Sequence, residues 1–268
     1  MAQFIPVNKE QHLNQGWQKP TSYDFTKQDM TIPVLLDELP HVVTTMPLVF
    51  TKRDDEGSFE LRVLASLEPG KNMYVSDEGQ WLIAYVPAIY RSYPFKALRS
   101  PETGKPALCF NLDSGLLLDA PRNEEEKLFA DDGSPAPKVK QIIEFLQKCE
   151  KNRTLTQKAV DTLAKYELLK AFRVKIKVKD QDDISVDGIY TVDERKVRSL
   201  DGDALQELNR NNAFAVIYAQ LFSQQRMDVF DKLYKLHEQL NKNGKQKSDV
   251  PKDLSGILSS NETVLNFD

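Results

Sequence analysis

The chain has 268 residues, a formal net charge of −4 and 40% hydrophobic residues. A chain of this length buries a substantial core without metal or disulfide support, and it allows one large domain or two small ones. The small negative charge gives no global basic field and the apolar runs are short, so we expect no nucleic-acid partner and no transmembrane segment.

The first half of the chain is predicted to be mainly β. Residues 1–30 are polar with scattered aromatic side chains, which indicates an arm wrapped on the body. Residues 32–45 are apolar, and Pro33 suits a helix start whereas Pro40 would kink or end that helix. Strands bounded by turn residues are expected at 46–51, 59–67, 73–75, 81–86, 107–112 and 116–118.

The segment from Trp81 to Phe95 is unusually dense in aromatic residues and prolines. Trp81–Val86 is an apolar run of strand length. Pro87 cannot continue a central strand, because it lacks an N–H group, but it suits the first turn of a helix. We therefore predict a strand, a short helix over Ala88–Tyr93 and an exit at the end of the segment, since Pro94 disfavours a longer helix.

Arg91 lies inside that short helix, close to Tyr90 and Tyr93. Its guanidinium group can stack on a ring, or bind a carboxylate or a phosphate through its fork of donors. Two interpretations are open. In the first, the segment is a structural corner with Arg91 in an ion pair; in the second, it is an anion or peptide site.

The second half is predicted to be mainly helical after a break at residues 131–137. Residues 172–179 alternate between apolar side chains and cations, which predicts a strand that forms a β-hairpin with residues 184–192. Its four cations, at 173, 175, 177 and 179, suit an exposed strand edge better than a phosphate site. Helices are expected at 139–149, 154–169 (capped by Thr154 or Thr156), 194–200, 204–211, 213–222 and 227–240.

These patterns predict an α+β fold. A mainly antiparallel β N-terminal half packs with a mainly helical C-terminal half that contains the β-hairpin, because long βαβ alternation is missing. We expect residues 1–133, with the N-terminal arm, and residues 134–240, with the hairpin at 172–192, to form one compact unit. Residues 241–268 are a linker and a C-terminal tail.

Local catalytic and metal-binding patterns are absent from the sequence. Phosphate loops, the nucleophile elbow and the zinc-binding His-Glu-x-x-His pattern do not occur, and the three histidines are far apart, so we expect no metal and no cofactor. Cys109 and Cys149 lie at apolar positions, which indicates packed thiols. The N-terminus lacks a secretory pattern, so we expect a cytoplasmic protein, with surface association only by a non-classical export route.

Carboxylates beside apolar runs are the remaining candidates for acid/base chemistry. They are Glu38, Asp113 and the pair Asp193-Glu194. Two of them in one cleft would have pKa values that differ enough for acid/base work. The structural alternative is that Asp113 stabilises a turn and Asp193 caps a helix, and we favour it.

Several separated segments match one known family in order and spacing over residues 33–236. The most specific contains Trp81, Tyr85-Val86-Pro87-Ala88 and Arg91-Ser92-Tyr93-Pro94-Phe95. Together they resemble the SapC-like bacterial protein family. The other matching pieces are Pro47–Phe50, Asn72–Val75, Leu108–Phe110, Asp113-Ser114, Leu128-Phe129, Gly133, Gly188–Glu194 and Ala219–Ser223.

The resemblance implies an accessory role more than an activity. The family name is associated with bacterial surface-layer, serum-resistance systems, whereas the unrelated peptide-transport permease of the same label would need membrane spans. Members often accompany flavin-dependent halogenase-like proteins, cupin-like proteins and outer-membrane receptors. The resemblance provides no set of catalytic residues.

Two functions from different classes follow. The first, which we favour, is a non-enzymatic binding or accessory protein with a protein or peptide partner. The second is a hydrolase- or transferase-like enzyme in which Arg91 binds an anionic substrate beside an acidic residue. The candidate binding residues are Trp81, Tyr85, Arg91, Tyr93, Asp113 and Glu194.

Overall fold

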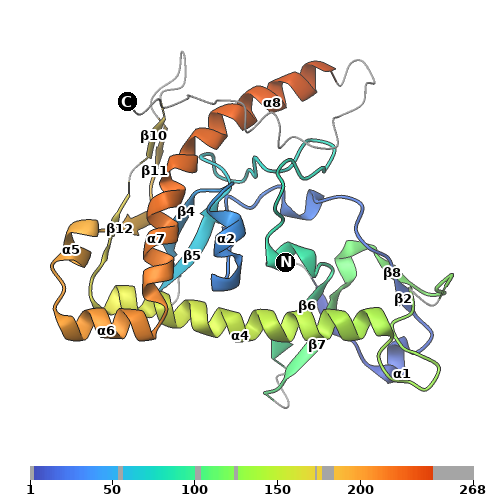
Figure 1. Ribbon diagram of the computed structural model, residues 1–268. Coiled ribbons are helices and arrows are strands. Elements are labelled where there is room, and N and C mark those ends of the chain that lie inside the picture. Colours follow the sequence, from blue (N-terminus) through green and yellow to red (C-terminus); the bar gives the residue numbers. More distant parts are fainter. Residues whose placement is uncertain are drawn as a thin grey trace, which may run out of the picture. The chain divides into compact units, whose positions relative to one another are not determined.

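The computed structural model describes residues 3–53, 57–99, 104–123, 126–172, 174–176 and 184–243. The fold is α+β, as predicted, with antiparallel strands mostly in the N-terminal half and helices mostly in the C-terminal half (Figure 1). The chain forms two compact units. Unit 1 comprises Met1–Thr21 and Ala88–Thr154, and unit 2 comprises Ser22–Pro87 and Leu155–Asp268.

Each unit combines segments from both sides of residue 133, where the sequence indicates a boundary. The division into residues 1–133, 134–240 and 241–268 stays a prediction about the organisation of the chain. Of the predicted linker and tail at 241–268, residues 241–243 belong instead to the last turn of α8, and residues 244–268 lie outside the described residues.

Unit 1 contains a three-stranded antiparallel sheet of order β1-β7-β6. The predicted N-terminal arm contributes β1 to this sheet, so it is integrated into the fold by backbone hydrogen bonds. A second antiparallel pair joins β2 and β8. The elements of this unit are β1 (Phe4–Pro6), α1 (Lys9–His12), β2 (Gly16–Trp17), α3 (Ala88–Arg91), β6 (Phe95–Arg99), β7 (Pro106–Asn111), η3 (Leu112–Ser114) and β8 (Leu117–Leu118).

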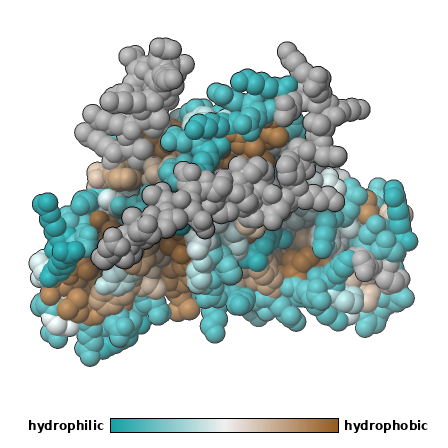
Figure 2. Space-filling view, turned by 45° about the horizontal axis from the view of Figure 1, so that its top comes forward, coloured by the Kyte–Doolittle hydropathy of each residue, from teal (hydrophilic) through white to brown (hydrophobic). Residues whose placement is uncertain are grey.

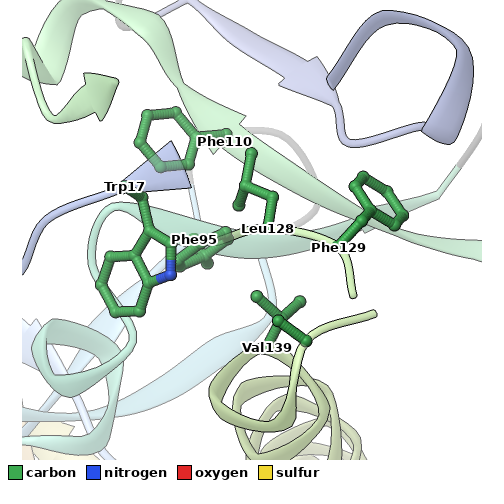
Figure 3. Close-up of a cluster of buried hydrophobic side chains, with 7 residues drawn as sticks. Trp17, Phe95, Phe110, Leu128, Phe129 and Val139 are labelled. Atoms are coloured by element: carbon green, nitrogen blue, oxygen red, sulfur yellow. The ribbon is translucent and has the colours of Figure 1, made fainter. Parts of the chain in front are cut away.

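The core of unit 1 is built around aromatic rings in edge-to-face contact (Figure 3). Phe95 makes edge-to-face contacts with Trp17 and Phe110, at centroid distances of 4.8 and 5.1 Å. This geometry places the positive edge of one ring on the negative face of another. The other members of the core are Leu128, Phe129, Ala136 and Val139.

Unit 2 contains a five-stranded antiparallel sheet of order β3-β5-β4-β12-β9. Since β12 pairs with β4, the two halves of the sequence share one sheet. The pair β10–β11 confirms the predicted hairpin, whereas residues 177–183 and the side chains of the four cations lie outside the described residues. The strands are β3 (Thr31–Pro33), β4 (Leu48–Lys52), β5 (Phe59–Leu64), β9 (Leu169–Ala171), β10 (Val174–Ile176), β11 (Ile184–Val186) and β12 (Ile189–Val192).

The helices that follow the sheet strands confirm the predicted order of elements. They are α5 (Glu194–Arg198), α6 (Gly202–Arg210), α7 (Ala213–Ser223), η4 (Gln224–Asp228) and α8 (Val229–Asn243). Before β4, the chain forms η1 (Asp24–Thr26), η2 (Leu36–Glu38) and α2 (Leu39–Val42).

One long helix, α4 (Pro137–Lys165), replaces the two helices predicted at 139–149 and 154–169. The predicted caps are used differently. The Thr154 hydroxyl donates to the carbonyl oxygen of Glu150 at 3.2 Å, inside the helix. The Thr156 hydroxyl accepts from the backbone N–H of Leu36 at 2.9 Å. Neither residue therefore begins a helix.

The strands predicted at 73–75 and 81–86 are wrong, whereas the short helix after Pro87 is confirmed as α3. Val75 and Trp81 form only an isolated bridge, and no regular ladder extends from it. The predicted helix start at Pro33 is also wrong, because Pro33 ends β3. Pro40 lies in the first turn of α2, where its missing N–H has no intrahelical partner to lose.

Candidate functional site

The six residues predicted from the sequence lie in two units. Trp81, Tyr85 and Glu194 belong to unit 2, and the other three belong to unit 1. The Trp81–Phe95 segment itself passes from unit 2 to unit 1 after Pro87. The two groups are therefore described separately.

Tyr85 is fixed by a buried carboxylate. Its hydroxyl donates to Oε1 of Glu38 at 2.9 Å, and the N–H of Leu35 donates to Oε2 at the same distance. Glu38 is only 3% exposed. The ring of His41 stacks on Tyr85 with a centroid distance of 5.1 Å. These contacts attach the segment before α3 to η2 and α2.

Trp81 is part of an aromatic cluster in the same unit. Its indole N–H donates to the carbonyl oxygen of Tyr85 at 2.9 Å. Its ring lies 5.5 Å from that of Tyr23 and 5.8 Å from that of Tyr74. Burial raises the pKa of Tyr74, whose hydroxyl donates to Leu64 at 3.0 Å. Trp81 thus contributes to packing around a buried phenol.

Arg91 is exposed at the end of α3, and its guanidinium carbon lies 5.2 Å from the ring centroid of Phe145 on α4. The stacking partner therefore comes from a helix about fifty residues further along the chain, and such a contact at an exposed site contributes about 0.5–1 kcal/mol. The sequence indicated stacking as one use of this arginine, but it did not identify the partner.

Asn111 links Tyr93 to Asp113. The Asn111 side chain donates to the Tyr93 hydroxyl at 3.3 Å and accepts from the backbone N–H of Asp113 at 3.1 Å. The Asp113 carboxylate accepts from the N–H of Gln3 at 2.8 Å. Burial raises the pKa of Tyr93 and the Asp113 charge adds to the effect, while the Asn111 hydrogen bond opposes it. Tyr93 is therefore a neutral phenol near a carboxylate at neutral pH.

Sequence reasoning missed Asn111, although a signal was present. Asn111 directly precedes η3 and its side chain caps that turn, and asparagine is among the residues most favoured at such positions. The structure therefore assigns the capping role to Asn111, while Asp113 binds a distant backbone group.

The ion pair of Glu194 involves none of the other candidate residues. Glu194 begins α5, is exposed, and forms an ion pair with Arg198 one turn along the same helix. The neighbouring Asp193 caps α5 by accepting from the N–H of Arg195 at 3.2 Å, as predicted. Burial raises the pKa of Asp193, but Lys170 and the backbone N–H groups together lower it by more, so the pKa is below its ordinary value.

The aromatic ladder, which we define as Phe214, Tyr218 and Phe222, was not predicted as a functional surface. These residues are spaced by four along α7, and neighbouring rings stack at 6.2 Å. Tyr218 is 51% exposed and Phe222 is 65% exposed. The available signal was that α7 has apolar residues on every side, so one apolar face must remain outside the core.

The family model for SapC matches residues 7–229. The chain belongs to the SapC family. No curated protein and no solved structure matches the chain. The match covers the six predicted residues and the aromatic ladder of this SapC-family chain.

Among the described residues, no three His, Cys, Asp or Glu side chains are grouped so that they could hold a metal ion. Within the same residues, no helix is long and apolar enough to cross a membrane.

Proposed function

We propose that this SapC-family chain is a non-enzymatic binding or accessory protein with a protein partner. The aromatic ladder is the observation that carries the proposal. Other large exposed apolar side chains, such as Leu13 and Leu155, are 38% and 41% exposed, below both Tyr218 and Phe222. The face drawn in Figure 2 is mainly hydrophilic, with apolar patches between the hydrophilic regions. Aromatic residues are enriched at interfaces, so the exposed rings of Tyr218 and Phe222 indicate a contact surface.

The buried face of α7, which does not include the aromatic ladder, packs this helix against the sheet. Val216, Ile217 and Gln220 are at most 1% exposed, and α7 packs on β4 and β12 (Figure 1). The ladder therefore projects from a helix that is held by other side chains. Shortening its rings is expected to leave the fold intact.

The sequence of α7 indicates the chemistry of the partner. No charged residue occurs between Ala213 and Ser223, while the exposed Arg210 and Arg226 flank the helix. Side chains spaced by four on one helix face are typical anchors in an apolar groove. We therefore expect a partner protein with an apolar groove and acidic residues around it.

The six residues predicted from the sequence stay candidate binding residues, separate from the aromatic ladder. Arg91 and Tyr93 are the ones to substitute first, because Arg91 is exposed and Tyr93 is half-buried. A link to the bacterial surface layer, which the family name implies, is also part of the proposal; the partner would then be a surface protein.

The test compares capture from native lysate by the wild-type chain and by Tyr218→Ala/Phe222→Ala. Leu155→Ala is the matched control, since it also removes an exposed apolar side chain. The captured protein is then purified and titrated. Loss of two central aromatic anchors is expected to weaken binding by at least about thirtyfold, while the control binds like wild type. Equal affinities for the double variant and the wild type would reject the ladder as the contact surface.

The enzyme alternative rests on one observation, the pair of hydrogen bonds through which the Asn111 side chain links the Tyr93 hydroxyl to the backbone of Asp113. A panel of p-nitrophenyl esters and phosphates tests it. Turnover by the wild-type chain that disappears in Asp113→Asn and in Arg91→Ala, with unchanged thermal melting, would support the enzyme over the binding protein.

A further inference from the structure

The core of unit 1 opens into a groove between the β6–β7 hairpin and α4. Its volume is about 310 Å³. Half-buried apolar side chains form the floor, and exposed polar side chains, among them Arg99, Glu150 and Lys151, form the rim. The floor residues are Ala97, Leu108, Ile143 and Leu146.

The strand register explains the groove. Phe95 pairs with Phe110, and the next pair on the same face of the sheet is Ala97 with Leu108. The two phenylalanines belong to the same buried cluster as Val139 (Figure 3). Ala97 is too short to fill the corresponding space one step further along the strand. The space between sheet and helix therefore stays open there.

The size and lining of the groove favour a small apolar group. A group the size of a water molecule takes up about 30 Å³, so a volume of about 310 Å³ holds about ten such groups, each with one non-hydrogen atom. Apolar side chains that face such an open groove are exposed to water, and an alkyl chain would remove that apolar surface from water. Small-molecule sites are typically of this kind, apolar with a few polar groups at the edge.

The charge at the rim favours an anion. The Glu150 carboxylate lies 3.5 Å from Nε of Arg153 on the same helix. Among the described residues, no ion pair engages Arg99 or Lys151. The planar guanidinium group of Arg99 matches the geometry of a carboxylate, with which it can form two parallel hydrogen bonds.

We propose that this groove binds a medium-chain carboxylate. The alkyl chain lies over Ala97 and Leu108, and the carboxylate is bound by Arg99 and Lys151. Octanoate, with about ten non-hydrogen atoms, matches the volume. The groove lies in unit 1 and the aromatic ladder in unit 2, so this proposal does not depend on the proposed protein partner.

The experiment titrates the full chain with sodium octanoate and with 1-octanol in a calorimeter. Arg99→Gln is expected to weaken octanoate binding about tenfold and to leave octanol binding unchanged, because only octanoate uses the charge. Ala97→Leu fills the groove and is expected to weaken both ligands by about tenfold or more. Lys96→Gln is the matched control, since Lys96 lies on the opposite face of β6, over the ring of Phe4.

Three results would overturn the proposal. The first is the absence of saturable heat with octanoate. The second is equal octanoate affinity in Arg99→Gln and Lys96→Gln. The third is a change of oligomeric mass in Ala97→Leu, which would assign the groove to a second copy of the chain. If Ala97→Leu fails to melt cooperatively, Lys151→Gln replaces it with the same expectation as Arg99→Gln.

Discussion

At the scale of single residues, the contact between Tyr85 and Glu38 makes the first prediction. Tyr85→Phe removes the hydroxyl that donates to the buried Glu38 carboxylate but keeps the ring that stacks on His41. We expect a loss of about 1–3 kcal/mol in the free energy of unfolding, because a buried charged acceptor loses a donor. Urea denaturation measures it. Tyr218→Phe, which removes an exposed hydroxyl, is the control and should change stability by less than about 0.5 kcal/mol.

Glu207 makes a pH-dependent prediction. Lys165 and Tyr166 donate to its carboxylate at 2.6–2.8 Å, and these hydrogen bonds lower its pKa below the ordinary value of 4.5. The folded chain therefore binds a proton less readily than the unfolded chain. The contribution of the Glu207 carboxylate to the free energy of unfolding is complete above pH 4.5. It is lost as the pH falls through the lower pKa of the folded chain.

The measurement for Glu207 is the urea midpoint of wild type and Glu207→Gln as the pH falls from neutral to below the ordinary carboxyl pKa. The wild-type chain should lose more stability on acidification than the variant, since the variant has no carboxylate to protonate. Parallel pH profiles would show that the ion pair is not maintained in solution.

At the scale of elements, Gln220 attaches α7 to the sheet. Its carbonyl oxygen accepts from the Val192 N–H and the Thr191 hydroxyl, both at 3.1 Å, and its amide donates to Leu48 at 3.2 Å. Gln220→Ala removes these three hydrogen bonds from buried groups, although the Thr191 hydroxyl keeps the bond that it accepts from the Gln224 side chain. We expect a loss of about 3 kcal/mol or more, measured by urea denaturation. The exposed Gln225→Ala should stay within about 0.5 kcal/mol of wild type.

Elements with a clear apolar period were predictable from the sequence. The strands β4 and β5 and the helices α5 to α8 follow the expected order, because each has apolar residues at recurring positions and is bounded by turn or cap residues. The run at 81–86 shows the limit of that reasoning. Leu82 and Ile83 are buried there, at 3% and 7% exposure, without a strand ladder. Apolar character predicts burial, but pairing depends on a partner strand.

The prediction of two helices where the structure has the single helix α4 was wrong for a related reason. Thr154 and Thr156 are residue types that begin helices, but a threonine hydroxyl can also bond to the preceding turn or to another segment. The sequence does not distinguish these uses, since the acceptor of Thr154 is local whereas the donor to Thr156 is 120 residues away.

The candidate site was predictable only in part for the same reason. Tyr85 and Glu38 are 47 residues apart, and Arg91 contacts a ring on another element. Such contacts depend on how the elements pack, which local patterns do not specify. The aromatic ladder could not be predicted as a surface, because the sequence of a helix that is apolar on all sides does not show which face stays exposed.

At the scale of the whole molecule, neither unit is a continuous piece of chain. The chain passes from one unit to the other after Thr21, Pro87 and Thr154, and the last passage lies inside α4. A helix is cooperative along its length, so unfolding of the first part of α4 removes support from the second. We therefore expect the two units to unfold together, in a single thermal transition with equal calorimetric and van't Hoff enthalpies.

Two core variants make this test decisive. Phe110 belongs to the core of unit 1 and Phe50 to the β4 strand of unit 2, and both side chains are fully buried. Phe110→Ala and Phe50→Ala should each lower the stability by about 3–5 kcal/mol and shift the same transition as a whole. Two resolved transitions, each sensitive to only one of the variants, would instead show that the units unfold independently. Hydrogen exchange would then show which amides belong to each transition, and the loss of protection should divide α4 near Thr154.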